Sequence, residues 1–154
     1  MRIRYAMLAA GALLAAGLGL SAAAPPRAAV VPMVVYKSPS CGCCRAWVDH
    51  VQASGFQVEA HDVSDARLAA VERESRVPDD LASCHTATVG GYVVEGHVPA
   101  DDIKRMLREK PAIAGISVAG MPMGSPGMEQ GGVTQPFTTT AFTKDGKKSV
   151  FARH

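Results

Sequence analysis

Residues 31–55 read VPMVVYKSPSCGCCRAWVDHVQASG. The apolar run 31–36 predicts a strand that is buried on both faces. After a turn at 37–40, apolar residues recur with helical spacing over 45–54, which predicts an amphipathic helix that ends at Gly55. The CGCC cluster is therefore expected at the strand-to-helix turn, beside the N-terminus of the helix.

Strands and helices continue to alternate in the rest of the chain. The segment 111–136 shows no periodicity and is rich in Gly, Pro and Met, so we expect a loop there. The order β-α-β-α-β-β-α is typical of a thioredoxin-like α/β sandwich with a mixed sheet, to which the Gly/Pro/Met-rich loop and a C-terminal hairpin are added. The further elements expected are a strand at 56–61, a helix from Ser64 to about Ser75, a hairpin of 86–89 and 92–95, a helix opened by Pro99, and a hairpin within 137–151.

The N-terminal residues predict export. Arg2 and Arg4 precede an apolar run from Leu8 to Leu20 and then small residues, which indicates a signal peptide at 1–23 and a single domain at 24–154. The run is short for a membrane anchor, although an uncleaved anchor is the alternative. Loss of two arginines from 16 basic residues leaves 14 against 14 acidic ones, which argues against nucleic-acid or membrane-surface binding after cleavage.

All four cysteines remain in the exported domain, where free thiols form disulfides or bind metals. Cys41 and Cys44 form a C-x-x-C motif with Cys43 inserted. The start of a helix favours the thiolate form, which serves both disulfide exchange and metal binding. Three interpretations stay open: a soft-metal site, a redox dithiol of Cys41 and Cys44, and two disulfides such as Cys41–Cys44 with Cys43–Cys84.

Two features argue against a simple oxidoreductase. Cys43 would interfere with a disulfide between its neighbours. The segment 83–88, where thioredoxin-like enzymes have a cis-proline, reads SCHTAT and contains no proline. If the fold is correct, Cys84 and His85 lie beside the CGCC turn although about forty residues away.

Four thiolates in one place need a cation, because only Lys37 and Arg45 are nearby in the sequence. Cu(I) accepts two or three thiolates and lets one sulfur bridge two ions, which suits the adjacent Cys43 and Cys44. Zinc is the competing metal, but structural zinc sites usually combine two C-x-x-C-like knuckles. We therefore favour copper, with more than one ion per chain.

The loop 120–128 reads GMPMGSPGM. Methionine on a helix usually fills the core, but these residues follow no helical pattern, and a thioether is a soft ligand that cannot be lost to a disulfide. At least one of Met121, Met123 and Met128 is a candidate ligand, and the alternative is that the loop covers a sheet edge. Among the histidines, His85 is a candidate ligand, His97 a hydrogen-bond partner at the site or at a helix start, and His50, His61 and His154 solvated surface or terminal residues.

The motifs CGCC (41–44), SCHTA (83–87), GYVVEGHVP (91–99) and GMPMGSPGME (120–129) together resemble the CopG-type copper-resistance proteins, a family of exported bacterial metal-binding proteins. The resemblance implies a thioredoxin-like domain that holds a cysteine-bridged, polynuclear copper cluster in the periplasm and contributes to copper tolerance. Carried over to matching positions, the cluster ligands are Cys41, Cys43, Cys44 and Cys84, with His85, Met121 and Met128 in or near the cluster.

The working hypothesis is a periplasmic Cu(I)-binding protein. It would limit free copper by sequestration, by transfer to a periplasmic export or transfer protein, or by redox conversion. The alternative is an enzyme, a thiol-disulfide oxidoreductase that uses Cys41 and Cys44. The sequence assigns no catalytic residue for turnover on copper.

Overall fold

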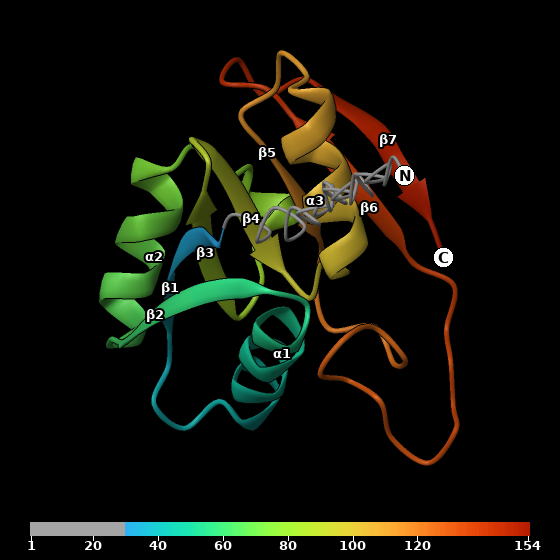
Figure 1. Ribbon diagram of the computed structural model, residues 1–154. Coiled ribbons are helices and arrows are strands. Elements are labelled where there is room, and N and C mark those ends of the chain that lie inside the picture. Colours follow the sequence, from blue (N-terminus) through green and yellow to red (C-terminus); the bar gives the residue numbers. More distant parts are fainter. Residues whose placement is uncertain (1–29) are drawn as a thin grey trace, which may run out of the picture.

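The computed structural model describes residues 30–154, and the signal peptide expected at 1–23 lies outside these residues. Within them, seven strands form a mixed sheet in the order β2-β1-β3-β4-β5-β6-β7 (Figure 1). The elements are β1 (Val31–Lys37), α1 (Gly42–Ala53), β2 (Phe56–Asp62), α2 (Asp65–Glu74), the short 3₁₀ helix η1 (Asp79–Leu81), β3 (His85–Val89), β4 (Tyr92–Gly96), α3 (Ala100–Glu109), β5 (Gly115–Val118), β6 (Thr138–Phe142) and β7 (Lys148–Arg153).

The first half of the sheet has the predicted thioredoxin-like pattern. β1 and β2 are parallel and joined through α1, while β3 runs antiparallel to both β1 and β4. Trp47 on α1 and Ile103 on α3 belong to one buried core cluster with Val35 of β1. The indole Nε1 of Trp47 also donates to the Val98 carbonyl at 2.9 Å, which joins α1 to the segment before α3. The α/β sandwich with a mixed sheet is thereby confirmed.

The predicted helix starts are close to the observed ones. α1 begins at Gly42, three residues earlier than expected, because Cys41 is its N-cap and accepts the Cys44 N–H on Sγ at 3.2 Å. At α2, the Ser64 hydroxyl accepts the Arg67 N–H at 3.3 Å, as the sequence predicts. The cysteine cluster therefore lies within the first turn of α1, where the helix field favours thiolates.

The segment 111–136 was expected to be an irregular loop throughout, and this is wrong because it contains the strand β5. Its four residues are all buried, and it pairs parallel to β4 and antiparallel to β6. A strand this short has no visible periodicity when both faces are covered. Gly115 is required, because a Cβ there would lie 2.3 Å from the Val93 carbonyl oxygen. The C-terminal hairpin of β6 and β7 is confirmed.

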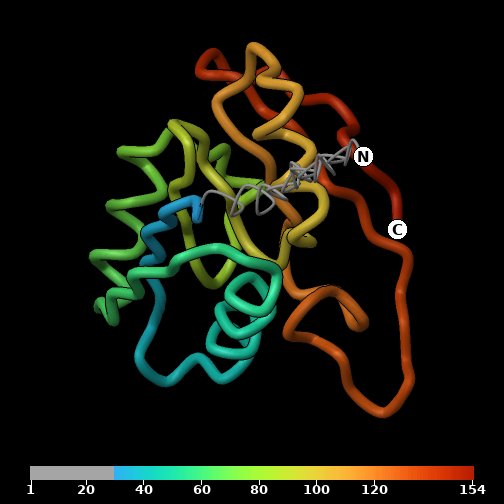
Figure 2. Tube along the Cα trace, in the orientation of Figure 1, coloured from blue at the N-terminus to red at the C-terminus, as the bar shows by residue number. Residues whose placement is uncertain are grey.

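The long connection between β5 and β6 runs past α1 before it returns to the sheet (Figure 2). We call residues 119–137 the methionine loop. Backbone hydrogen bonds hold this loop together. The Gly124 N–H donates to the Met128 carbonyl at 3.0 Å, and the Met128 N–H donates to the Ser125 carbonyl at 2.8 Å. In residues 30–154 no helix has the length and apolar character needed to cross a membrane.

Candidate metal centre

The four cysteines meet at one end of the sheet. Cys41, Cys43 and Cys44 come from the start of α1, and Cys84 immediately precedes β3. Their four Sγ atoms all lie within 4.8 Å of one another. Cys41 Sγ lies 3.4 Å from Cys43 Sγ, and Cys44 Sγ lies 3.3 Å from the Cys84 carbonyl oxygen. The prediction that Cys84 folds back beside the CGCC turn is confirmed.

Two of these sulfurs are oxidised. Cys41 and Cys44 form a disulfide, whereas Cys43 and Cys84 are free thiols. Of the two disulfides in the third interpretation, Cys41–Cys44 is present and Cys43–Cys84 is not. Thiolates, not disulfides, are the usual sulfur ligands of metals, so all four sulfurs are available as candidate ligands only after a two-electron reduction of Cys41–Cys44.

Cys84 lies between two imidazole rings. Its Sγ is 3.2 Å from Nε2 of His97 and 3.5 Å from Nδ1 of His85. Burial, followed by the charge of nearby Cys43, raises the pKa of the Cys84 thiol to about 12. The metal-free thiol is therefore protonated at neutral pH, and a bound cation would stabilise the thiolate in its place.

The ring of His97 is held in a defined orientation. The ring is buried, and its Nδ1 lies 2.8 Å from the Pro126 carbonyl oxygen in the methionine loop. A carbonyl only accepts, so Nδ1 carries the proton and Nε2 presents a lone pair toward Cys84. Burial lowers the pKa of His97, which keeps the ring neutral and able to bind a metal.

His85 is also a neutral, buried ring. Burial and the neighbouring His97 lower the pKa of His85 to about 3. Its ring packs 4.4 Å from that of Trp47 and meets the His97 ring edge-on at 5.0 Å. Within the described residues its Nε2 is the one buried side-chain nitrogen or oxygen without a hydrogen-bond partner. Donor atoms of Cys84, His85 and His97 lie within 4.8 Å of one another, a second group that shares Cys84 with the sulfur cluster.

The methionine loop brings one thioether to the cluster. Met121 Sδ lies 3.9 Å from Cys43 Sγ, and Met121 as a residue is 53% exposed. In the described part of the chain, no hydrogen-bond-range contact joins Met123 or Met128 to a cysteine. Of the three candidate methionines, the structure therefore places Met121 beside the sulfurs.

A glycine lets the loop approach the helix. Gly127 has φ of +84°, and a Cβ on it would lie 2.7 Å from the Cys43 carbonyl oxygen and 2.8 Å from the Trp47 nitrogen. The neighbouring Pro126 supplies the carbonyl that orients His97. The loop thus forms one wall of the site, and its backbone fixes a candidate ligand.

Comparisons with known proteins agree with this geometry. A family model described as "Protein of unknown function, DUF411" matches residues 81–128, which contain Cys84, both site histidines and most of the methionine loop. Two solved structures, "Copper resistance protein copG" in Form 1 and Form 2, are each 40% identical to this chain with a TM-score of 0.76. Each match covers 81% of this chain and 98% of the other.

The chain belongs to the CopG family of copper resistance proteins. The resemblance drawn from the four motifs is thereby confirmed. No curated protein matches the chain. The CopG assignment gives the family and does not by itself assign a ligand in this chain.

Sequence reasoning about this CopG-family chain missed His97 as a candidate ligand. The sequence did contain a signal that His97 lies beside Cys84. A hairpin that turns at Gly90-Gly91 pairs Thr86 with Glu95. Continuing this register by two residues places Cys84 opposite His97. The sequence interpretation gave His97 only a hydrogen-bonding role.

Two other histidines differ from expectation. His50 is not a free surface residue, because its Nε2 accepts the Ala100 N–H at 3.1 Å and so caps α3. His154 Nε2 lies 2.9 Å from Asp102 Oδ2, and its ring stacks on Phe137. They were expected to be solvated surface or terminal residues. His154 is terminal, but its side chain, like that of His50, makes a tertiary contact. His61, with 42% of its side chain exposed, is a surface residue as expected.

Proposed function

We propose that this protein is exported to the periplasm and holds Cu(I) in a cluster of cysteine thiolates, so that it lowers the concentration of free copper. The observation that carries the proposal is the convergence of four Sγ atoms within 4.8 Å. The names of the two related structures support copper as the metal. Export rests on the signal peptide predicted from residues 1–23.

The donor set fits several soft ions better than one zinc ion. Cys84 belongs both to the group of four sulfurs and to the group with His85 and His97. A sulfur shared in this way can bridge two metals, which thiolates do readily for Cu(I). A single tetrahedral zinc would use four ligands and leave the remaining donors unpaired. We therefore infer more than one copper ion per chain, held by Cys41, Cys43, Cys44 and Cys84, with His85, His97 and Met121 as further ligands.

The negative charge of the four thiolates also favours bound cations. Lys37 is paired with Asp62 and is not free to compensate thiolates. Four thiolates in a partly buried site repel one another unless a positive charge lies among them. Bound Cu(I) ions supply that charge. Met128, which the family resemblance placed in or near the cluster, is proposed as a packing residue of the loop.

The disulfide makes copper capacity depend on the redox state. With Cys41 and Cys44 oxidised, only Cys43 and Cys84 remain as thiol donors. Reduction doubles the number of thiolates available. The bound ions would then be stored, or passed by ligand exchange to a periplasmic export or transfer protein.

Copper titration of the reduced protein tests the proposal. The protein is reduced and titrated with Cu(I) without oxygen, and the copper content per chain is measured together with X-ray absorption at the copper edge. We expect more than one copper per chain, copper–sulfur scattering and a copper–copper distance that indicates shared sulfurs. Cys84→Ser should lower the copper content and remove the copper–copper signal. A content of one or less, or oxygen and nitrogen ligands alone, would exclude the cluster.

One observation favours a second function, thiol-disulfide exchange. The Cys41–Cys44 disulfide occupies the start of α1, as in a redox C-x-x-C site. However, residues 30–154 contain no cis peptide bond, and Cys84 occupies the loop where oxidoreductases have their cis-proline. An oxidoreductase should reduce a model disulfide without metal, and Cys84→Ser should leave that activity nearly unchanged. Copper binding predicts the opposite pattern for this variant.

A further inference from the structure

Resting on the proposed function, we propose that a groove between α2 and the cysteine cluster is the entrance for copper. In this proposal, two carboxylates in the groove favour Cu(I) complexes with a net positive charge over anionic ones. The groove would thereby select both the form of copper that the protein accepts and the side from which it arrives, whatever the number of ions finally bound.

The groove opens directly on two of the candidate ligands. Its volume is about 320 Å³, and Cys41 and Cys84 both line it. Cys43 does not line it and instead lies beside exposed Met121. The full lining is Ser38, Cys41, Asp65, Leu68, Ala69, Glu72, Ser83 and Cys84.

The charged groups of the groove are both negative. Asp65 and Glu72 are seven residues apart on α2, so they lie on the same face of the helix two turns from each other. No ion pair of the described residues involves either carboxylate, whereas Arg67 on the same helix is paired with Glu74. The lining contains no lysine or arginine. A cation that approaches Cys41 and Cys84 through this groove therefore meets two carboxylates and no cationic side chain of the lining, while Arg73, outside the lining, offsets part of the charge of Glu72.

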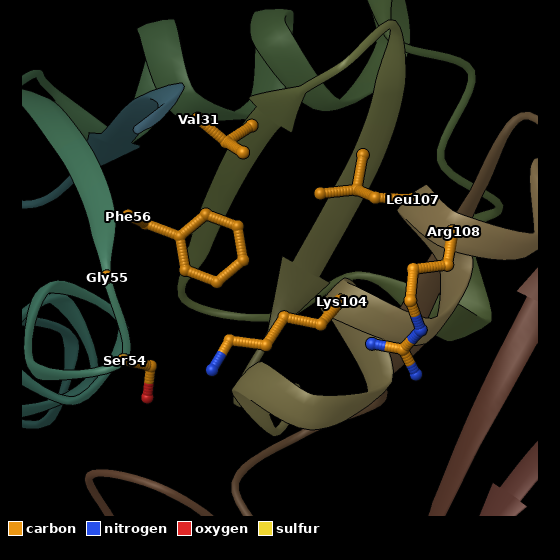
Figure 3. A pocket seen from close by; sticks show the side chains of 7 residues that line it. All are labelled: Val31, Ser54, Gly55, Phe56, Lys104, Leu107 and Arg108. Atoms are coloured by element: carbon orange, nitrogen blue, oxygen red, sulfur yellow. The ribbon is translucent and has the colours of Figure 1, made fainter. Parts of the chain in front are cut away.

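Another cavity, away from the cysteines, has the opposite character. It measures about 400 Å³ and lies between the start of β2 and α3, where Phe56 and Leu107 face Lys104 and Arg108 (Figure 3). It contains no sulfur and no carboxylate. A hollow of about 320 Å³ within the methionine loop also carries a carboxylate, Glu129, but no sulfur. The groove beside the cysteines differs from both hollows because it combines two carboxylates with two candidate sulfur ligands.

The charge of the copper donor then decides the rate of uptake. A donor that holds Cu(I) through neutral thioether, imidazole or nitrile ligands keeps the positive charge of the ion, whereas a polythiolate or sulfonated chelate is negative. Transfer is a ligand exchange in which a copper–donor bond breaks, a copper–Sγ bond forms and the thiol proton leaves. Copper remains Cu(I) throughout, so no oxidant or reductant is needed.

Stopped-flow loading with two donors of opposite charge tests this assignment. Fully reduced protein is mixed without oxygen, at low ionic strength, with the acetonitrile complex of Cu(I), a cation, or with the trianionic bathocuproine disulfonate complex. The variant is Asp65→Asn with Glu72→Gln. We expect uptake from the cation to slow by about five-fold and uptake from the trianion to become faster, with the same final copper content.

A matched variant controls for net charge. Asp49→Asn with Glu109→Gln removes two carboxylates that lie outside the groove and should leave both rates within a factor of about two. Equal rates in the groove variant and the parent, or changes of the same sign with both donors, would overturn the entrance. A strong slowing by Met121→Leu with no effect of the groove variant would also overturn it. If the reduced protein binds no copper from either donor at equilibrium, the proposed function itself fails.

Discussion

Cys84 Sγ lies 3.2 Å from His97 Nε2. The two residues are opposite each other when the pairing of β3 with β4 is continued beyond the hairpin strands. Thr86 is paired with Glu95. Cys84 lies two residues before Thr86, and His97 lies two residues after Glu95. In a continued antiparallel register, both side chains therefore emerge on the same face. A local hairpin thus brings a thiol and an imidazole together, without needing a contact with the CGCC turn.

This relationship predicts the effect of His97→Asn. The asparagine amide keeps an N–H donor at the position of Nδ1 for the Pro126 carbonyl but removes the imidazole lone pair that faces Cys84. We expect the affinity for Cu(I) to fall by about 10- to 100-fold, as for other changes around metal ligands, with little change in thermal stability. Competition with a chromophoric Cu(I) chelator measures the affinity. His61→Asn at the surface serves as the control, and equal affinities of the two variants would remove His97 from the site.

Cys84 should be an unreactive thiol in the metal-free protein. Because burial and the charge of Cys43 raise its pKa to about 12, on the order of one thiol in ten thousand is ionised at pH 8. Alkylation by iodoacetamide, followed by mass spectrometry, should be at least about 100-fold slower than in the denatured chain. The rate should keep rising with pH beyond 9, whereas simple steric protection would level off near the ordinary thiol pKa. Cys43→Ser should increase the rate.

Much of the fold can be predicted from short segments of the sequence. The apolar run before CGCC, the Ser64 cap and the Gly90-Gly91 turn each determine a local structure with few alternatives. Their order then restricts the sheet topology. β5 could not be predicted in this way, since four buried residues after an unpatterned stretch carry no period, and their pairing depends on strands on either side.

The site could be predicted in part. That Cys84 lies near Cys41 and Cys44 follows from the topology alone. Which thiols are oxidised does not, because the sequence contains the same four cysteines in either redox state. Nor does the sequence distinguish Met121 from Met128, because only the path of the loop over α1 determines which thioether reaches Cys43.

The packing of the methionine loop predicts a difference between two glycines. Gly127→Ala places a Cβ against the Cys43 carbonyl and the Trp47 nitrogen, in addition to the cost of a left-handed conformation. Gly131 also has a positive φ, of +59°, but has no atom near its added Cβ. We expect Gly131→Ala to lower the free energy of unfolding by about 1 kcal/mol and Gly127→Ala by about 2–4 kcal/mol.

Chemical denaturation of the metal-free variants provides the comparison. Gly127→Ala should also weaken Cu(I) binding, since a displaced loop no longer orients His97 through Pro126. If both variants lose the same stability, the loop does not pack on α1 as described.

A buried carboxyl beneath the site predicts how stability changes with pH. Glu95 is fully buried and accepts the Ser83 N–H and the Thr86 hydroxyl, each at 2.7 Å, so it links the residues on either side of Cys84. Burial raises the pKa of Glu95 to about 8, and the two hydrogen bonds oppose this only in part. The folded protein therefore holds this proton at pH values where the unfolded chain, with a pKa near 4.5, has released it.

Stability should consequently fall as the pH rises from about 4.5 to about 8 and change little from this group above 8. The loss attributable to Glu95 is roughly 3 kcal/mol between pH 5 and 8. Glu95→Gln, which resembles the protonated acid in shape, should remove this part of the pH dependence and be more stable than the parent at pH 8. Urea denaturation of the metal-free proteins from pH 5 to 9 provides the measurement. Parallel stability curves for parent and variant would show that Glu95 is ionised in the folded protein across this range.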